Sequence, residues 1–159
     1  MSISTQQKAE RFLSSLRHCQ ILGMEVVETF PDGLTMRLPY SEKIIGNPLT
    51  QVVHGGSLTT LMDTASGTAV FVTLPGFELC PTLDLRMDYM KAAQAGHDLI
   101  AEARVVRTTA NVVFTECDVF QENDHALIAR CNATFMRIGA DLTPPSFRQQ
   151  IEARAGEQP

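Results

Sequence analysis

The sequence predicts a single α+β domain in which an antiparallel sheet wraps around one long central helix. Three observations support this prediction. Apolar residues recur with a helical period between residues 56 and 70. Two short segments before this helix and four after it alternate between apolar and polar residues, as half-buried strands do. No change of composition divides the 159 residues, and their 44% hydrophobic content suffices for one core.

The chain outside the main domain is short at both ends. Residues 1–20 are expected to contain a short amphipathic helix, over residues 5–17, that packs on the main domain of residues 21–139. The tail, residues 140–159, is poor in apolar residues and rich in proline, so we expect it to be partly disordered. Its possible anchors are Leu142, Phe147 and Ile151.

The strands are predicted from alternation and from turn residues between them. Residues 24–29 and 34–38 flank Pro31-Asp32-Gly33 and form a first hairpin. The four later strands are expected to form an antiparallel meander joined by short turns. They centre on residues 83–89, 99–105, 113–119 and 127–135.

The helix carries one carboxylate away from its apolar stripe. Asp63 shares a helix face with small and polar residues only, so a ligand or another backbone could approach it closely. Such an aspartate could act as a base, although most helical aspartates are simply solvated. The stripe itself comprises Leu58, Leu61, Met62, Ala65 and Ala69.

Gly55 and Gly56 open the same helix. The first N–H groups of a helix have no partner within it, and the helix dipole favours negative charge there, so an oxyanion could bind. A Gly-Gly pair can also be only a tight turn. The preceding His54 is either a capping or packed residue or a direct substrate contact, and the sequence leaves this open.

This region resembles the hotdog-fold acyl-CoA thioesterases of the phenylacetate-degradation (PaaI-like) type. The shared pattern is His54-Gly-Gly with an aspartate nine positions after the histidine, preceded by Gly46-Asn47-Pro48 and followed by a strand over residues 82–90. The resemblance covers roughly residues 20–138. One departure is Gln51, which stands in the loop where many relatives have glycine. The resemblance implies a hotdog domain that forms dimers, often paired into tetramers.

Geometry indicates that the catalytic site is shared between subunits. Gly55 and Asp63 lie about 12 Å apart along one helix, whereas an oxyanion donor and a base must both reach within about 3 to 4 Å of one carbonyl. If both act, Gly55 of one subunit must meet Asp63 of another, as a two-fold pair of antiparallel helices allows.

The expected reaction is hydrolysis of a coenzyme A thioester. The Gly55 N–H would stabilise the oxyanion, and Asp63 would act either as general base or as nucleophile. Gly56 is expected to lie against the substrate, and Asn47 and His54 to shape the loop and the thioester contact. The resemblance implies that the hydroxyl of Thr82 helps to hold the attacking water. Their structural alternatives are a loop turn for Asn47, a helix cap for His54 and an ordinary strand position for Thr82.

The rest of the substrate would need an apolar slot and cations. We expect side chains of the central helix to line the acyl pocket, and basic residues near the sheet rim to meet the phosphates of coenzyme A. The helix candidates are Leu58, Leu61, Met62 and Phe71, and the basic candidates are Lys91, Arg104, Arg107 and Arg137.

Composition excludes several other classes. A net charge of −5 and a pI near 5.3 argue against nucleic-acid binding. The four cysteines show no zinc-like spacing, so no metal is expected, and no cofactor other than coenzyme A as part of the substrate. We expect no membrane span and no signal peptide, and hence a cytoplasmic protein.

Two other functions remain open at this point. A hydratase or dehydratase of acyl thioesters would use His54 for proton transfer, and a non-catalytic acyl-CoA-binding module would need neither the base nor the oxyanion donor. The spacing of His54 and Asp63 favours the thioesterase.

Overall fold

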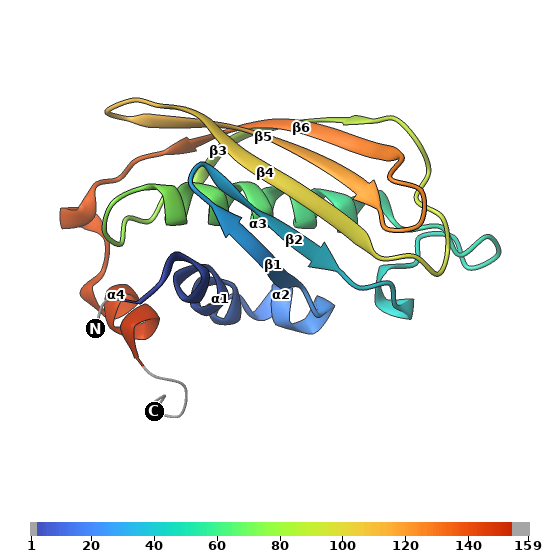
Figure 1. Ribbon diagram of the computed structural model, residues 1–159, viewed down its shortest axis with the longest axis horizontal. Helices are drawn as coiled ribbons and strands as arrows, with labels where there is room; N and C mark the ends of the chain where they lie inside the picture. Colours follow the sequence, from blue (N-terminus) through green and yellow to red (C-terminus); the bar gives the residue numbers. More distant parts are fainter. Residues whose placement is uncertain (1–2, 154–159) are drawn as a thin grey trace.

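The computed structural model describes residues 3–153 and shows a six-stranded antiparallel sheet curved around one long helix, α3 (Figure 1). The strand order is β1-β2-β4-β5-β6-β3. The α+β class is confirmed, but the predicted four-strand meander is wrong in its first strand. Only β4, β5 and β6 are consecutive neighbours, because the first hairpin pairs with β4 through β2, and β3 pairs instead with β6 at the other edge. The element bounds are β1 Glu25–Phe30, β2 Gly33–Leu38, α3 Gly55–Thr73, β3 Thr82–Tyr89, β4 Leu99–Thr108, β5 Val112–Gln121 and β6 Leu127–Met136.

Helix α3 is buried on two sides. All five residues of the predicted stripe are at most 3% exposed and face the sheet, where they meet inward residues such as Met36, Ala101 and Cys131. The opposite side of α3 is partly covered by α1. Within residues 3–153, no helix combines the length and the apolar character that a membrane crossing requires.

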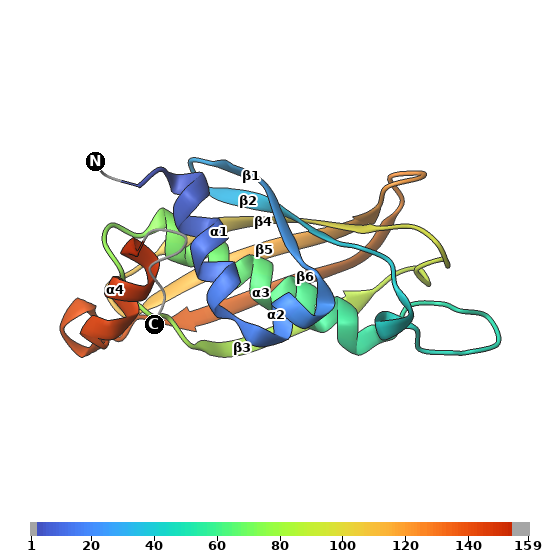
Figure 2. The same ribbon diagram turned by 90° about the horizontal axis from the view of Figure 1, so that it is seen from below.

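The predicted N-terminal helix is two helices. Helix α1, Thr5–Ser15, begins with a capping box at Ser4 and Gln7, and α2, Arg17–Leu22, follows after Leu16 adopts extended dihedrals. Seen from below, α1 and α2 cross in front of α3 on the side away from the sheet (Figure 2). They therefore form a third layer that encloses part of α3.

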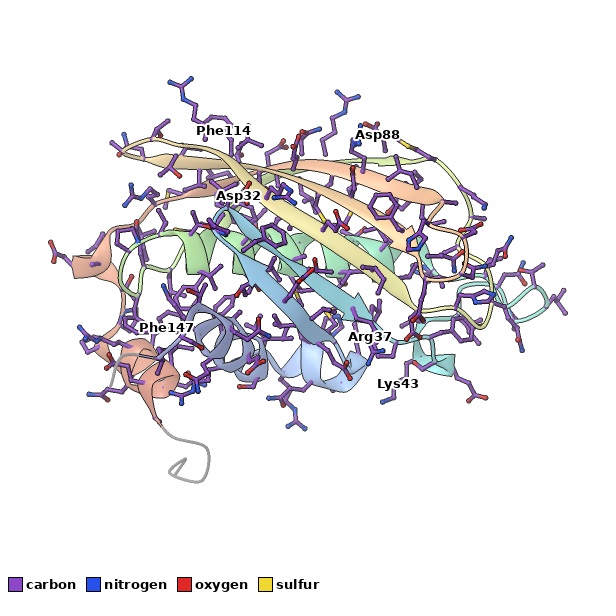
Figure 3. The ribbon with its side chains drawn as sticks, viewed as in Figure 1. Asp32, Arg37, Lys43, Asp88, Phe114 and Phe147 are labelled. Carbon is purple, nitrogen blue, oxygen red and sulfur yellow. The ribbon has the colours of Figure 1, made fainter. Side chains whose placement is uncertain are left out.

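Part of the tail, which is predicted to be partly disordered over residues 140–159, is helical. Residues 145–152 form helix α4, Pro145–Glu152, after a short 3₁₀ turn. The ring of Phe147, labelled in Figure 3, packs edge-on against Phe12 and Phe71. Ile151 is fully buried, whereas Leu142 is exposed. Two of the three expected anchors thus hold α4 on α1. The prediction of disorder for residues 154–159 lies outside the described residues.

One edge of the sheet is left open. Among the described residues, strand β3 pairs only with β6, and it is exposed along most of its length, whereas the other edge strand, β1, is contacted by α1. An uncovered edge strand presents unpaired backbone groups that can pair with another chain. This edge lies beside α3, close to the residues considered next.

Candidate active site

The start of α3 is held by His54 acting as its N-cap. The ring Nδ1 of His54 accepts a hydrogen bond of 2.9 Å from the Gly56 N–H. The ring is therefore neutral in this geometry, with its proton on Nε2. A Cβ atom at position 56 would lie 2.9 Å from that Nδ1, so this capping geometry requires glycine there. The capping alternative for His54 is the geometry observed.

The Gly55 N–H remains available at the helix terminus. No described residue accepts a hydrogen bond from it, while its carbonyl oxygen accepts from the hydroxyl of Tyr89 at 3.1 Å and from the hydroxyl of Thr59 at 3.2 Å. The two hydroxyls are 3.0 Å apart. Sequence reasoning missed Tyr89, because nothing in the local pattern of β3 signals a contact with a helix start 34 residues away.

The loop before His54 has a defined shape. Asn47 turns the chain by accepting the Leu49 N–H on its side-chain oxygen at 2.9 Å. Gln51 adopts a φ of 57°, the left-handed conformation that glycine occupies at lower cost, and the Tyr40 hydroxyl donates to its carbonyl at 2.8 Å. Gln51 thus keeps the backbone conformation that a glycine would allow. Asn47 is exposed and serves as a loop turn within the single chain.

Asp63 is oriented by Thr82. The Thr82 hydroxyl donates to Oδ1 of Asp63 at 2.8 Å, and no described residue donates to the second oxygen, Oδ2. The carboxylate is partly exposed on the face of α3 between α1 and β3. One carboxylate oxygen is therefore fixed and the other is free to accept a proton from water.

Two connected hollows meet at this carboxylate. The first has a volume of about 360 Å³ and is mainly apolar, with Asp63 and Thr82 at one end and Phe12 and Phe71 in its wall. Its other lining residues are Leu16, Thr64, Gly67, Glu78, Leu79, Cys80, Pro81, Phe135 and Ile138. The second is an open groove that shares Asp63, Thr64 and Thr82 and extends to His18 and Thr59.

The thiols near these hollows are not activated. Burial raises the pKa of Cys80 to about 11, and burial also raises the pKa of Cys19, which lines the groove. Both thiols are protonated at neutral pH and are therefore poor nucleophiles. Glu78 also lines the first hollow, where a hydrogen bond from the Arg137 guanidinium lowers the pKa of its carboxyl, and the two form an ion pair of 2.9 Å.

Several expected substrate contacts lie elsewhere. Leu58 and Met62 are 3% and 0% exposed in the core between α3 and the sheet, and neither lines a hollow at Asp63. Of the four expected pocket residues, only Phe71 lines the first hollow. The reason is that the apolar stripe of α3 faces the middle of the sheet, while the hollow lies along α3 between α1, the start of β3 and the end of β6.

Most of the expected phosphate contacts are already paired. Arg104 lies on the outer side of β4, where it pairs with Asp32 at 2.9 Å and stacks over the ring of Phe30 (Figure 3 labels Asp32). Lys91 pairs with Asp124. Arg107 follows a bulge in β4 and is exposed, with no ion pair among the described residues. None of these cations lines the hollows at Asp63.

Among residues 3–153, no three His, Cys, Asp or Glu side chains gather in a position to hold a metal ion. What the site offers is an oriented carboxylate, an apolar hollow beside it, and a helix N-terminus with a free N–H. These are the groups needed to activate water and to stabilise an oxyanion. The class of protein that this fold defines is the hotdog fold, and the groups at the site suit the hydrolysis of a thioester.

Comparison with known proteins identifies the family. Residues 50–128 match the model of the thioesterase superfamily. A candidate esterase of Halobacterium salinarum is 38% identical over 108 residues, which cover 66% of this chain and 70% of the relative. A crystal structure from Pseudomonas aeruginosa is 50% identical, covers 85% of this chain and 100% of its own, and superimposes with a TM-score of 0.77. The chain belongs to the thioesterase superfamily.

Two further proteins are similar to this chain. Human acyl-coenzyme A thioesterase 13 is 31% identical over 81 residues, which cover 49% of this chain and 55% of that protein. The PaaI protein of Escherichia coli shares the fold with a TM-score of 0.75 at 18% identity, covering 86% of this chain and 97% of its own. The resemblance expected from residues 46–90 is therefore confirmed at the level of family and fold.

Proposed function

We propose that the protein hydrolyses acyl-CoA thioesters to a free acid and coenzyme A. The observation that carries the proposal is the Asp63 carboxylate, fixed through one oxygen by Thr82, at the end of an apolar hollow of about 360 Å³. A fixed carboxylate with one free oxygen suits the activation of water, and an apolar hollow beside it suits an acyl group.

The proposed site draws on two subunits. Gly55 and Asp63 are about 12 Å apart along α3, too far for both to act on one carbonyl. Two copies of the chain that pair through the open β3 edges, related by a two-fold axis, would set their α3 helices side by side. The start of one helix would then face Asp63 of the other, with two equivalent sites per dimer.

The roles follow from the charge that develops in the reaction. Oδ2 of Asp63 takes a proton from water as the water oxygen attacks the thioester carbonyl, and the Gly55 N–H of the other subunit stabilises the oxyanion that forms. The thiolate of coenzyme A leaves when the tetrahedral intermediate collapses. Direct attack by Asp63 is the alternative, and it would proceed through an acyl-enzyme anhydride that water cleaves.

The substrate is expected to span both hollows. We place the acyl group in the apolar hollow and the pantetheine arm in the open groove that leads from Asp63 past Thr59. Arg107, an exposed cation without an ion pair among the described residues, is retained as a candidate for the phosphates. The proposed assembly is a homodimer or a dimer of such dimers. Free thiols at all four cysteines support a reducing compartment, the cytoplasm.

The test is a panel of acyl-CoA thioesters assayed for release of free thiol. The Asp63→Asn variant should lower kcat at least about a hundredfold and leave substrate binding nearly unchanged. Asp84→Asn, at an exposed position on the same strand as Thr82, is the matched control and should behave as wild type. Near-normal turnover by a folded Asp63→Asn protein would remove Asp63 from the mechanism, and no thiol release from any thioester would refute the proposed function.

A further inference from the structure

The hydroxyl of Tyr89 rests on the first turn of α3. It lies 3.1 Å from the Gly55 carbonyl oxygen and 3.0 Å from the Thr59 hydroxyl, and it would contact a Cβ atom added to Gly55 at 3.4 Å. Tyr89 belongs to the end of β3, so this contact joins the sheet edge to the helix start. The ring and its hydroxyl therefore cover one side of Gly55.

The peptide unit between Gly55 and Gly56 is anchored at both ends. Its carbonyl oxygen accepts from Tyr89 and from Thr59, and its N–H donates to Nδ1 of His54. Two consecutive glycines form the most pliable start that a helix can have. With both ends of this peptide unit anchored, the first turn of α3 is held in place, and with it the direction of the neighbouring Gly55 N–H, which has no acceptor among the described residues.

The contact of Tyr89 differs from an ordinary helix contact. A threonine hydroxyl often bonds to the carbonyl four residues earlier, as Thr59 does with Gly55, and this needs no functional reason. The hydroxyl of Tyr89 reaches the same carbonyl from another element, and Tyr89 is 55% exposed, so burial of the ring does not account for its placement. One strand thus holds Asp63 through Thr82 at its start and Gly55 through Tyr89 at its end.

We propose that Tyr89 is a positioning residue that fixes the direction of the Gly55 N–H as the oxyanion donor. The inference rests on the proposed function, and it adds a residue to the same site. An oxyanion donor is effective because it is oriented before the charge develops, and small misplacements of reacting groups lower rates strongly. Tyr89 acts through the backbone of Gly55 and contacts neither the thioester nor the water.

The test compares Tyr89→Phe with wild type in the thiol-release assay. The variant keeps the ring and removes only the hydroxyl, so kcat should fall about tenfold while KM changes less than about twofold, since the loss concerns the transition state alone. Thr59→Val, which removes the second hydroxyl, should lower kcat as well, whereas Thr59→Ser, which keeps a hydroxyl, should retain a kcat close to that of wild type. Asp88→Asn, which alters the outer side of β3 next to Tyr89, is the control and should leave kcat unchanged (Figure 3 labels Asp88).

A second measurement tests the contact of Tyr89 with the start of α3 independently of catalysis. Amide hydrogen exchange at Gly56 should become about tenfold faster in Tyr89→Phe, because the bond from Gly56 to His54 opens more often when the carbonyl anchor is lost. The thermal midpoint should stay close to that of wild type, since Tyr89→Phe keeps the ring and removes a single hydroxyl. Unchanged kcat together with unchanged Gly56 exchange would overturn the inference.

Other results are also decisive. A rise of KM with unchanged kcat would make Tyr89 a substrate contact and would overturn its positioning role. If wild-type protein releases no thiol from any thioester, the proposed function fails. Gly56 exchange in Tyr89→Phe still decides whether the hydroxyl anchors the helix start.

Discussion

Phe12 on α1 should set the length of the acyl chain that the enzyme accepts. Its ring lines the apolar hollow and stacks on Phe71 with the ring centroids 4.6 Å apart, so it closes the hollow on the side of α1. The perturbation is Phe12→Leu, which removes about three carbon atoms from this wall while keeping an apolar side chain.

The expected magnitude follows from the burial of methylene groups. In wild type, each methylene that enters the hollow should improve kcat/KM by up to about 0.8 kcal/mol, or about fourfold, until the hollow is filled, after which the gain should stop. In Phe12→Leu this limit should move outward by about two to three carbons. The loss of packing should lower the free energy of unfolding by about 1 to 2 kcal/mol.

The assay is kcat/KM for straight-chain acyl-CoA thioesters from acetyl to palmitoyl. Phe147→Leu is the matched control, because Phe147 packs on both Phe12 and Phe71 but does not line the hollow. It should cost similar stability without moving the chain-length limit. The same limit in wild type and Phe12→Leu, or an equal shift in Phe147→Leu, would refute the assignment of this hollow to the acyl chain.

Two further predictions concern the carboxylate and the contact of α1 with α3. Thr82→Val removes the hydroxyl that orients Asp63, and since a hydrogen bond to a charged group contributes about 1.5 to 3 kcal/mol and this one is exposed, kcat should fall about tenfold. Thr82→Ser should retain most of the wild-type kcat. Equal kcat values for Thr82→Val and Thr82→Ser would contradict the role of the Thr82 hydroxyl in orienting Asp63. Burial lowers the pKa of Lys8 from 10.5 to about 8. The unfolded chain therefore binds more protons between these values, so wild type should gain stability relative to Lys8→Met as pH rises from 8 to 10.5 in urea unfolding. A constant or decreasing difference would contradict the burial of this ammonium group.

Much of the fold could be predicted because its elements carry their own periodic pattern. The stripe from Leu58 to Ala69 and the alternation in β4, β5 and β6 are local sequence patterns. They are regular because each element buries one face against the same core. Helix α4 has only one apolar pair at helical spacing, Phe147 and Ile151, which is a short signal within a polar tail. The contacts of Phe147 with Phe12 and Phe71 and the burial of Ile151 hold this helix on the domain.

The candidate site could be predicted only in part for a similar reason. His54, Gly55 and Asp63 stand in a recognisable spacing, so they could be named from the sequence. Tyr89 acts through a hydroxyl that reaches a helix from a distant strand, and no spacing within β3 reveals this. An apolar stripe on a helix fits a protein core and a substrate pocket equally well, so the sequence alone does not place Leu58 and Met62, which lie in the core of the single chain.

The central claim is that one site uses Gly55 of one subunit and Asp63 of the other, and mixed dimers test it most directly. Asp63→Asn removes the base, and Gly55→Pro removes the donor N–H at a helix position where proline is tolerated. The extended conformation of His54, with ψ of 132°, suits a residue before proline.

Each variant alone should be nearly inactive. Equal co-expression gives about half mixed dimers, and each mixed dimer has one site with both groups intact, so about a quarter of all sites should be active. Thiol release at about a quarter of the wild-type rate is the predicted result. Activity no higher than that of the parental variants, with mixed dimers shown to be present and folded, would contradict the shared site.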